Sequence, residues 1–282
     1  MNVARVVAGL VGASLALVAL LAVGSCARGP QSAGPGPSRA AEPSASTTMQ
    51  PCFDDVEDGG LPITRVGGVS SYGAAPNQRS ARSENIWSTS STCSKLVIGQ
   101  RVVYSFDIQP QLGPTGYSVW QTVSQLQGPT TNGTWLGPPV ALVVESGQWR
   151  VSGGYLAANG RGGLRRDFGY TKYLSQVRAG TWQHWTFDVL LSGPGTGSVT
   201  AWLDGKIVVD GLKPAGGTMY TTGGGYSHQY LQLKTGQYTG SDDIADLPTW
   251  RRLVLVKNVR LSIVSPRRTG PSVPGPLRPL GH

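Results

Sequence analysis

The sequence predicts an all-β protein, a jelly-roll β-sandwich with an open concave groove and disordered termini. Three observations support this: many short segments rich in β-branched and aromatic residues, Gly/Pro clusters between them, and an Asp204-Gly205 hairpin signal joining two of them. The sequence shows no heptad pattern, long amphipathic helix or fixed repeat. Many short strands in one domain favour a sandwich. The expected strands are 102–108, 119–126, 140–144, 149–151, 182–191, 198–203, 206–209, 230–233 and 253–264.

The N-terminal residues predict export. Arg5 makes the N-terminal region positively charged, residues 6–23 are apolar, and Gly24 and Ser25 precede Cys26. This resembles a bacterial lipoprotein signal, which implies cleavage before Cys26 and lipidation of its thiol. We therefore expect residues 1–26 to be the signal peptide with its lipid-bearing Cys, and the protein to be a cell-membrane lipoprotein facing the outside. A retained transmembrane helix is the alternative, because the apolar length is borderline for one.

Composition divides the rest of the chain. Residues 27–51 are mostly Ser, Pro, Ala and Gly and predict a disordered linker, since such a segment buries little apolar surface. Residues 52–266 form the expected domain, and 267–282 form a disordered, basic, Pro-rich tail. With Cys26 lipidated, Cys52 and Cys93 remain as a pair in an oxidising compartment, so we expect a disulfide; two free thiols are the alternative.

The charge balance suggests an anionic partner. The formal net charge is +9, from 24 Lys+Arg and 15 Asp+Glu, and part of the excess lies in the two tails. A basic exported β protein suits acidic polysaccharide, envelope polymer or lipid headgroups, and charge that serves only solubility is the alternative. No recognised nucleic-acid-binding module is present, so no nucleic-acid partner is expected.

The segment 230–238, YLQLKTGQY, has the clearest functional pattern. Side chains alternate along a strand, so Tyr230, Gln232, Lys234 and Tyr238 share one face while the leucines between them point to the core. An ammonium can neutralise a sugar carboxylate and favour an ionised phenol, which then accepts a proton. Tyr and Lys on a solvated face without function are the alternative.

Four segments together resemble the jelly-roll polysaccharide lyases, the concanavalin A-like group that includes alginate lyases, glucuronan lyases and heparin lyase I. The segment 230–238 is similar to their late strand, which has an aromatic residue followed by Lys, Gly and Tyr. Arg82-Ser83-Glu84 resembles the early Arg-Ser-Glu strand, and Gln125-Leu126-Gln127 stands where those enzymes have Gln-x-His. The fourth segment, 181–185 with 201–206, resembles paired strands common to the wider group. The order agrees over about 53–264.

The resemblance implies β-elimination on an acidic, uronate-containing polysaccharide. The reaction removes the proton next to a carboxylate and expels the glycosidic oxygen, so the site needs groups that neutralise the carboxylate. Arg82, Gln125 and Lys234 would do this, and Tyr238 would be the base, the acid or both. Expected substrate-binding residues on the same groove are Glu84, Gln127, His228, Tyr230 and Gln232.

One position departs from the family pattern. Gln127 replaces the family's His, and an amide is no base near neutral pH. A site with Tyr238 as sole base and acid restricts the stereochemistry of the substrate, whereas a non-catalytic descendant would only bind. His228 has the parity of Tyr230 and is a candidate for the groove; for His184, on a Trp-flanked strand, a structural role is expected.

Other chemistries lack support in the sequence. The Ser residues lack a partnered His and Asp, and no paired carboxylates suit a glycoside hydrolase. Asp242, Asp243 and Asp246 predict a solvated acidic loop rather than a cation site, as do the acids of 54–58. We expect a monomer without cofactor or metal. The rival interpretations are a carbohydrate-binding module with a lyase-like fold and a structural envelope lipoprotein.

Overall fold

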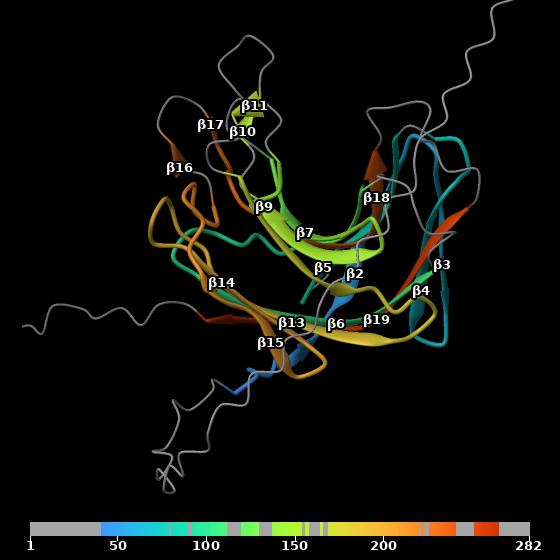
Figure 1. The fold of residues 1–282 in the computed structure, drawn as a ribbon, viewed down its shortest axis with the longest axis horizontal. Coiled ribbons are helices and arrows are strands. Elements are labelled where there is room, and N and C mark those ends of the chain that lie inside the picture. Colours follow the sequence, from blue (N-terminus) through green and yellow to red (C-terminus); the bar gives the residue numbers. More distant parts are fainter. Residues whose placement is uncertain are drawn as a thin grey trace, which may run out of the picture. The chain divides into compact units, whose positions relative to one another are not determined.

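The computed structural model describes residues 41–78, 80–89, 92–111, 120–129, 137–153, 156–157, 164–165, 169–219, 221–222, 226–240 and 251–264. All regular secondary structure within these ranges is β, arranged as two stacked antiparallel sheets (Figure 1). The predicted all-β sandwich of jelly-roll type is therefore confirmed. Within these ranges, no helix is long and apolar enough to cross a membrane.

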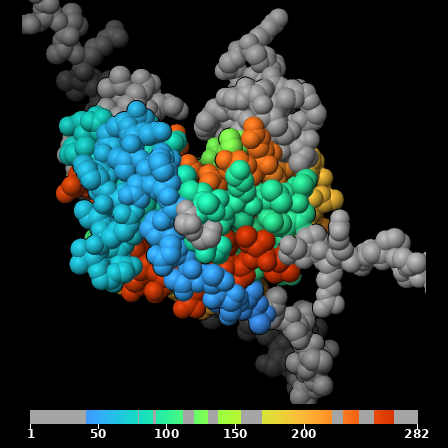
Figure 2. All heavy atoms as spheres, turned by 180° about the vertical axis from the view of Figure 1, so that it is seen from behind, coloured from blue at the N-terminus to red at the C-terminus, as the bar shows by residue number. Residues whose placement is uncertain are grey.

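The larger sheet has eight strands. Its order is β15-β14-β13-β6-β19-β4-β3, with β1 paired to β19 off this path. The bounds are β1 Thr47–Thr48, β3 Gly60–Val66, β4 Val69–Ala74, β6 Arg101–Gln111, β13 Gln183–Leu190, β14 Ser198–Leu203, β15 Lys206–Leu212 and β19 Arg252–Val264. In the space-filling view the N-terminal strands (blue) lie against the C-terminal strand (red), as expected from the pairing of β4 with β19 (Figure 2).

The second sheet has seven strands in the order β12-β9-β8-β7-β18-β5-β2. Their bounds are β2 Gln50–Glu57, β5 Ser80–Ser88, β7 Trp120–Gln127, β8 Val140–Glu145, β9 Gln148–Gly153, β12 Tyr170–Gln176 and β18 Gln232–Gly240. Two short hairpins complete the described strands, β10 Leu156–Ala157 with β11 Leu164–Arg165 and β16 Thr221–Thr222 with β17 Tyr226–Ser227. Strand β18 lies between β7 and β5, although these three segments are far apart in sequence.

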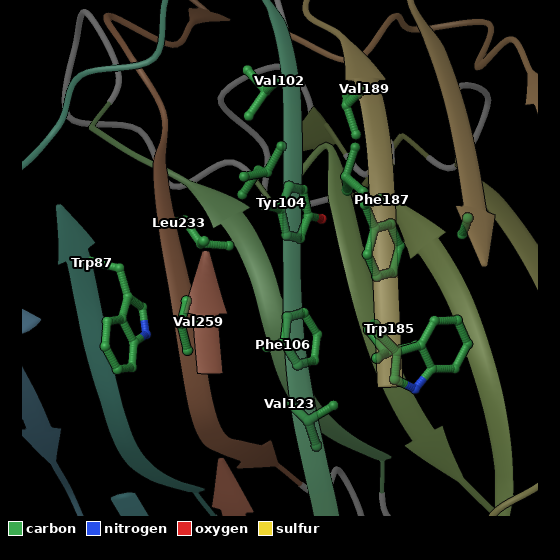
Figure 3. Close-up of a cluster of buried hydrophobic side chains, with 14 of the residues drawn as sticks. Trp87, Val102, Tyr104, Phe106, Val123, Trp185, Phe187, Val189, Leu233 and Val259 are labelled. Carbon is green, nitrogen blue, oxygen red and sulfur yellow. The ribbon is translucent and has the colours of Figure 1, made fainter. Parts of the chain in front are cut away.

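The core between the sheets is aromatic at its centre. Tyr104 and Phe106, two residues apart on β6, both point into the core. The ring centre of Phe187 on β13 lies 4.9 Å from that of Tyr104 (Figure 3). Trp185 continues this row. Its ring packs edge to face against Trp149, which belongs to the other sheet, and the ring centres are 5.3 Å apart. Such pairs stabilise beyond their buried area, by about 0.5–1.5 kcal/mol each.

The structured region begins before the boundary that composition predicts. Strand β1 and the first residues of β2 lie within 27–51, the segment expected to be a linker. Thr47 pairs with Leu261, and Met49 is buried in the core. Strand pairing and the buried Met49 side chain thus join this polar segment to the sheet. Its composition alone does not predict a strand. Cys26 and residues 267–282 lie outside the described residues.

The predicted disulfide is confirmed. Cys52 on β2 and Cys93, in the segment that follows β5, are bonded, with Cα atoms 5.4 Å apart. Strand β2 is the edge strand of the seven-stranded sheet. The disulfide therefore ties an edge strand to a segment distant in sequence.

Candidate active site

Strand β18 places the candidate catalytic residues at the middle of the seven-stranded sheet. Leu231 and Leu233 are buried in the core, so the residues that alternate with them point away from it. Lys234 and Tyr238 lie on this second face, called here the polar face. Their register partners on the neighbouring strands, Gln125 for Lys234 and Arg82 for Tyr238, point to the same face. Four residues from three strands thus converge.

Gly236 sets the spacing between Lys234 and Tyr238. Its φ is +148°, and a Cβ there would lie 2.3 Å from the carbonyl oxygen of Ser83 on β5. The register of β18 against β7 shifts between Thr235 and Tyr238, which marks a bulge at this glycine. A bulge re-aims the side chains that follow it. The Gly of the sequence motif is therefore a backbone requirement of the site.

Tyr238 is held by two neighbours. The guanidinium of Arg82 lies 4.6 Å from its ring centre, and the ring of Trp120 meets it edge to face at 5.3 Å. Trp120 therefore lies beside the site, whereas Trp149 is buried in the core.

Glu84 lies beneath this cluster. Its side chain is fully buried and accepts hydrogen bonds from Gln125 Nε2 at 2.8 and 3.0 Å, while Arg82 Nε lies 3.6 Å from it. Burial raises the pKa of Glu84 above its ordinary value, although Lys234, Arg82 and Gln125 favour its charged form. Glu84, for which the resemblance implies a substrate-binding role, is fully buried and contacts Gln125 and Arg82.

Two further acids complete the cluster, and sequence reasoning missed them. Asp55 and Glu57 lie on β2, opposite Glu84 and Arg82 of β5. Lys234 Nζ donates to Asp55 Oδ2 at 2.8 Å, and Arg82 Nη1 donates to Glu57 Oε2 at 3.0 Å. The expectation of a solvated acidic loop over 54–58 is therefore wrong for Asp55, which is buried.

The electrostatics of Arg82 follow from these neighbours. Burial opposes its charge, but Glu84, Asp55 and Glu57 raise the pKa of the guanidinium above its ordinary value. Arg82 Nη1 also lies 3.5 Å from Asp55 Oδ2. Arg82 and Lys234, the two cations of this cluster, are thus held by three carboxylates of the same chain.

Gln127, His228 and Gln232 form a second group farther along β7. Gln127 is the register partner of Gln232, and its Oε1 lies 3.1 Å from His228 Nε2. His228 is buried, and burial lowers its pKa to about 4, so the imidazole is neutral near pH 7. The structure thus places a histidine against the Gln that replaces the family's His, but as a buried partner. Tyr230 precedes β18, and Lys95 Nζ lies 4.9 Å from its ring centre.

The polar face continues across β8, β9 and β12. Arg150 Nη1 donates to Glu145 Oε2 at 2.5 Å, and the Tyr173 hydroxyl donates to the same oxygen at 2.8 Å. Tyr173 is exposed on β12. Side chains able to bind hydroxyl groups therefore extend beyond the central strands.

His184 belongs to a different place. It lies on β13, on the face of the eight-stranded sheet that points away from the core, beside a cavity of about 440 Å³. Its Nδ1 lies 2.6 Å from Asp107 Oδ1, and Asn258 Nδ2 donates to Asp107 Oδ2 at 2.6 Å. These bonds agree with the structural role expected for His184. Residues 42–45 line the same cavity, called here the His184 cavity.

In the described part of the chain, no group of three or more His, Cys, Asp or Glu side chains is arranged to hold a metal ion. Asp242, Asp243 and Asp246 lie outside that part.

Comparison with solved structures finds proteins of the same sandwich fold. The endo-β-1,4-glucuronan lyase of the fungus Trichoderma reesei has a TM-score of 0.56 at 14% identity, over 74% of this chain and 90% of that one. An alginate lyase of Zobellia galactanivorans has a TM-score of 0.49 at 14% identity, over 72% of this chain and 80% of that one. A search of curated protein sequences finds no match.

A family model described as "Polysaccharide lyase" matches residues 59–250. The chain belongs to this family, and the class of enzyme is therefore a lyase. The resemblance inferred from the four sequence segments is confirmed. The matched range includes Arg82, Gln125, Lys234 and Tyr238 but begins after Asp55 and Glu57.

Proposed function

We propose that this protein cleaves a uronate-containing polysaccharide by β-elimination at the polar face. The observation that carries the proposal is the convergence of Tyr238, Arg82, Lys234 and Gln125 from three neighbouring strands. These groups supply a proton-transfer residue next to donors for a carboxylate, which is the set that elimination needs.

The steps follow from the chemistry of a uronate. Tyr238, as the phenolate, takes the proton from the carbon next to the carboxylate. The electron pair left behind forms a carbon–carbon double bond, and the glycosidic C–O bond breaks. The leaving oxygen takes a proton, and with Tyr238 as the nearest acid this is the proton just removed, so both groups leave from the same side of the ring. Gln125, held by Glu84, hydrogen-bonds the carboxyl group while charge develops on it.

Trp120 and Tyr173 support the assignment of a sugar chain. Trp120 packs on Tyr238 and is partly exposed, and Tyr173 is exposed on the same side of the sheet. An aromatic ring on a polar sheet face suits the apolar face of a sugar ring.

The site of action is part of the proposal. The signal-like residues 1–26 and the linker after them support a lipid anchor at Cys26 and action outside the cell membrane. Cys26→Ala should release the protein from membranes or block its processing while the sandwich stays folded. If Cys26→Ala stays in the membrane fraction at the size of the full precursor, residues 6–23 would instead be an uncleaved transmembrane helix.

The experiment that tests the activity is digestion of a panel of acidic polysaccharides by the purified protein. Each elimination creates a double bond conjugated with the carboxyl group, so ultraviolet absorbance rises with turnover. Alginate, glucuronan and glycosaminoglycans present mannuronate, guluronate, glucuronate and iduronate. Rising absorbance on at least one supports the proposal; salt-sensitive binding without absorbance on the whole panel would contradict it and favour a binding module.

A further inference from the structure

The cations that elimination needs are already occupied by carboxylates of the protein itself. Lys234 Nζ bonds Asp55 Oδ2 at 2.8 Å, with both side chains about nine-tenths buried. Lys234 reaches Asp55 across β5, because β18 and β2 are not adjacent. Arg82 is held by Glu57 and lies 3.5 Å from Asp55.

The charges do not favour an added anion. Asp55, Glu57 and Glu84 face two cations, so the cluster is neutral with Glu84 protonated and carries one negative charge with Glu84 ionised. A substrate carboxylate that approaches Lys234 meets the Asp55 carboxylate at the same ammonium. Two like charges in such a confined place repel strongly, because little water separates them.

The position of Asp55 is built by the fold. Asp55 lies on the edge strand β2, three residues after Cys52, whose disulfide ties this strand down. Its neighbour Asp54 points to the opposite face, where it accepts a hydrogen bond from Asn85 and pairs with Arg65. The strand therefore presents one acid to the polar face and keeps the other away from it.

We propose that Asp55 determines the charge selectivity of the lyase, a statement that rests on the proposed function. Its carboxylate takes the place on Lys234 that a substrate carboxylate would otherwise take. The site then favours uronate chains of low charge density, whose reacting carboxyl group is an ester, over chains in which every sugar is ionised. An ester keeps the acidic neighbouring proton and needs no cation, and its carbonyl oxygen accepts a hydrogen bond from Gln125. The proton goes to Tyr238 and the glycosidic oxygen leaves as in the charged case.

The test compares Asp55→Asn with Asp54→Asn. Both variants remove one negative charge from adjacent positions, but only the first removes it from the polar face. Binding is measured by titration calorimetry and turnover by absorbance, on glucuronan and alginate in the ionised and in the partly methyl-esterified form. Glu57→Gln, at an exposed acid, provides a second variant whose folding is not at risk.

We expect wild-type protein to prefer the partly esterified polymers. Asp55→Asn should shift the ratio of affinities about tenfold toward the ionised polymers, equivalent to about 1.4 kcal/mol. This shift in the ratio should change little as salt is raised, because the Asp55 and Lys234 charges are buried and in contact, and salt screens such pairs much less than exposed charges. Glu57→Gln should act in the same direction with a smaller shift, and Asp54→Asn should leave the ratio unchanged.

An unchanged ratio in both Asp55→Asn and Glu57→Gln, or an equal loss of affinity for both polymer forms, would overturn the role of Asp55. Absence of absorbance in every variant would overturn the lyase proposal instead, and the calorimetric ratio would still decide about Asp55.

Discussion

The polar face of the seven-stranded sheet and the His184 cavity of the eight-stranded sheet contain similar groups in different surroundings. In the first, the Glu84 side chain is fully buried, and the side chains of Lys234 and Asp55 are 11% and 10% exposed. In the second, the His184 side chain is 43% exposed and its partner Asp107 is 20% exposed. Judged by residue types alone, the Asp107–His184 pair beside a cavity resembles an active site more than the polar-face cluster does. The family match and the converging strands nevertheless point to the polar face. Water screens the charges of the cavity, whereas buried charges act on one another and on whatever binds there.

The first prediction tests whether chemistry is confined to the polar face. Tyr238→Phe removes only the oxygen that transfers the proton, so turnover should fall at least about hundredfold while polysaccharide binding is retained. His184→Gln keeps hydrogen-bonding ability in the cavity and should leave turnover unchanged. Initial rates of absorbance increase measure both. A loss of turnover in His184→Gln equal to that in Tyr238→Phe would move the active site to the cavity.

The second prediction concerns the disulfide, which anchors the strand carrying Asp55. Replacing Cys52 and Cys93 together with Ser should lower the free energy of unfolding by about 3 to 4 kcal/mol, because the sequence separation of 41 residues leaves the unfolded chain much freer. Denaturant unfolding of wild-type and double-variant protein measures the difference. Equal midpoints and slopes for the two proteins would show that β2 is held by strand pairing alone.

The third prediction is a pH dependence of stability from His228. Burial lowers the pKa of this imidazole from 6.5 to about 4, so between these values the unfolded chain binds a proton that the folded chain does not. The contribution of His228 to stability is complete above pH 6.5 and is lost as the pH falls through 4, at about 1.4 kcal/mol per pH unit and about 3 kcal/mol in all.

His228→Gln should remove this loss while a hydrogen bond to Gln127 remains possible. Unfolding curves of both proteins from pH 8 to pH 4 give the difference in stability at each pH, and the value at pH 8 is the baseline. A difference that stays constant over the whole range would contradict a neutral, buried His228.

The fourth prediction compares the two clusters directly through their central carboxylates. Glu84→Ala leaves Gln125 Nε2 without its buried acceptor and removes the carboxylate beside Arg82 Nε, and should destabilise by about 2 to 3 kcal/mol. Asp107→Ala leaves Asn258 and His184 near water and should cost less than about 1 kcal/mol. Thermal or denaturant unfolding separates the two. Equal losses would show that burial does not distinguish the clusters.

Much of the fold could be predicted from the sequence, because the strands of the core show a local alternation of apolar residues. The expected strands from 102 to 209 correspond to β6, β7, β8, β9, β13, β14 and β15, with ends shifted by a few residues. These strands have alternating apolar residues. Strands β2, β3, β4 and β12 were not predicted, and β5 was expected only through the resemblance of Arg82-Ser83-Glu84. Small, polar and charged residues interrupt the apolar alternation in these segments, so pairing with neighbouring strands rather than local pattern places them in the sheets.

The candidate site divides in the same way. The alternation of 230–238 predicted that Lys234 and Tyr238 face away from the core, and the resemblance of short motifs identified Arg82 and Gln125. The tertiary structure was needed to show that β2 lies beside β5, that Asp55 contacts Lys234 across that strand, and that His228 is buried against Gln127. The period of a strand is a property of neighbouring residues and can be read along the chain. Which charged side chains lie close together depends on the order of the strands in the sheet. That order brings together segments far apart in sequence and depends on how the whole core packs.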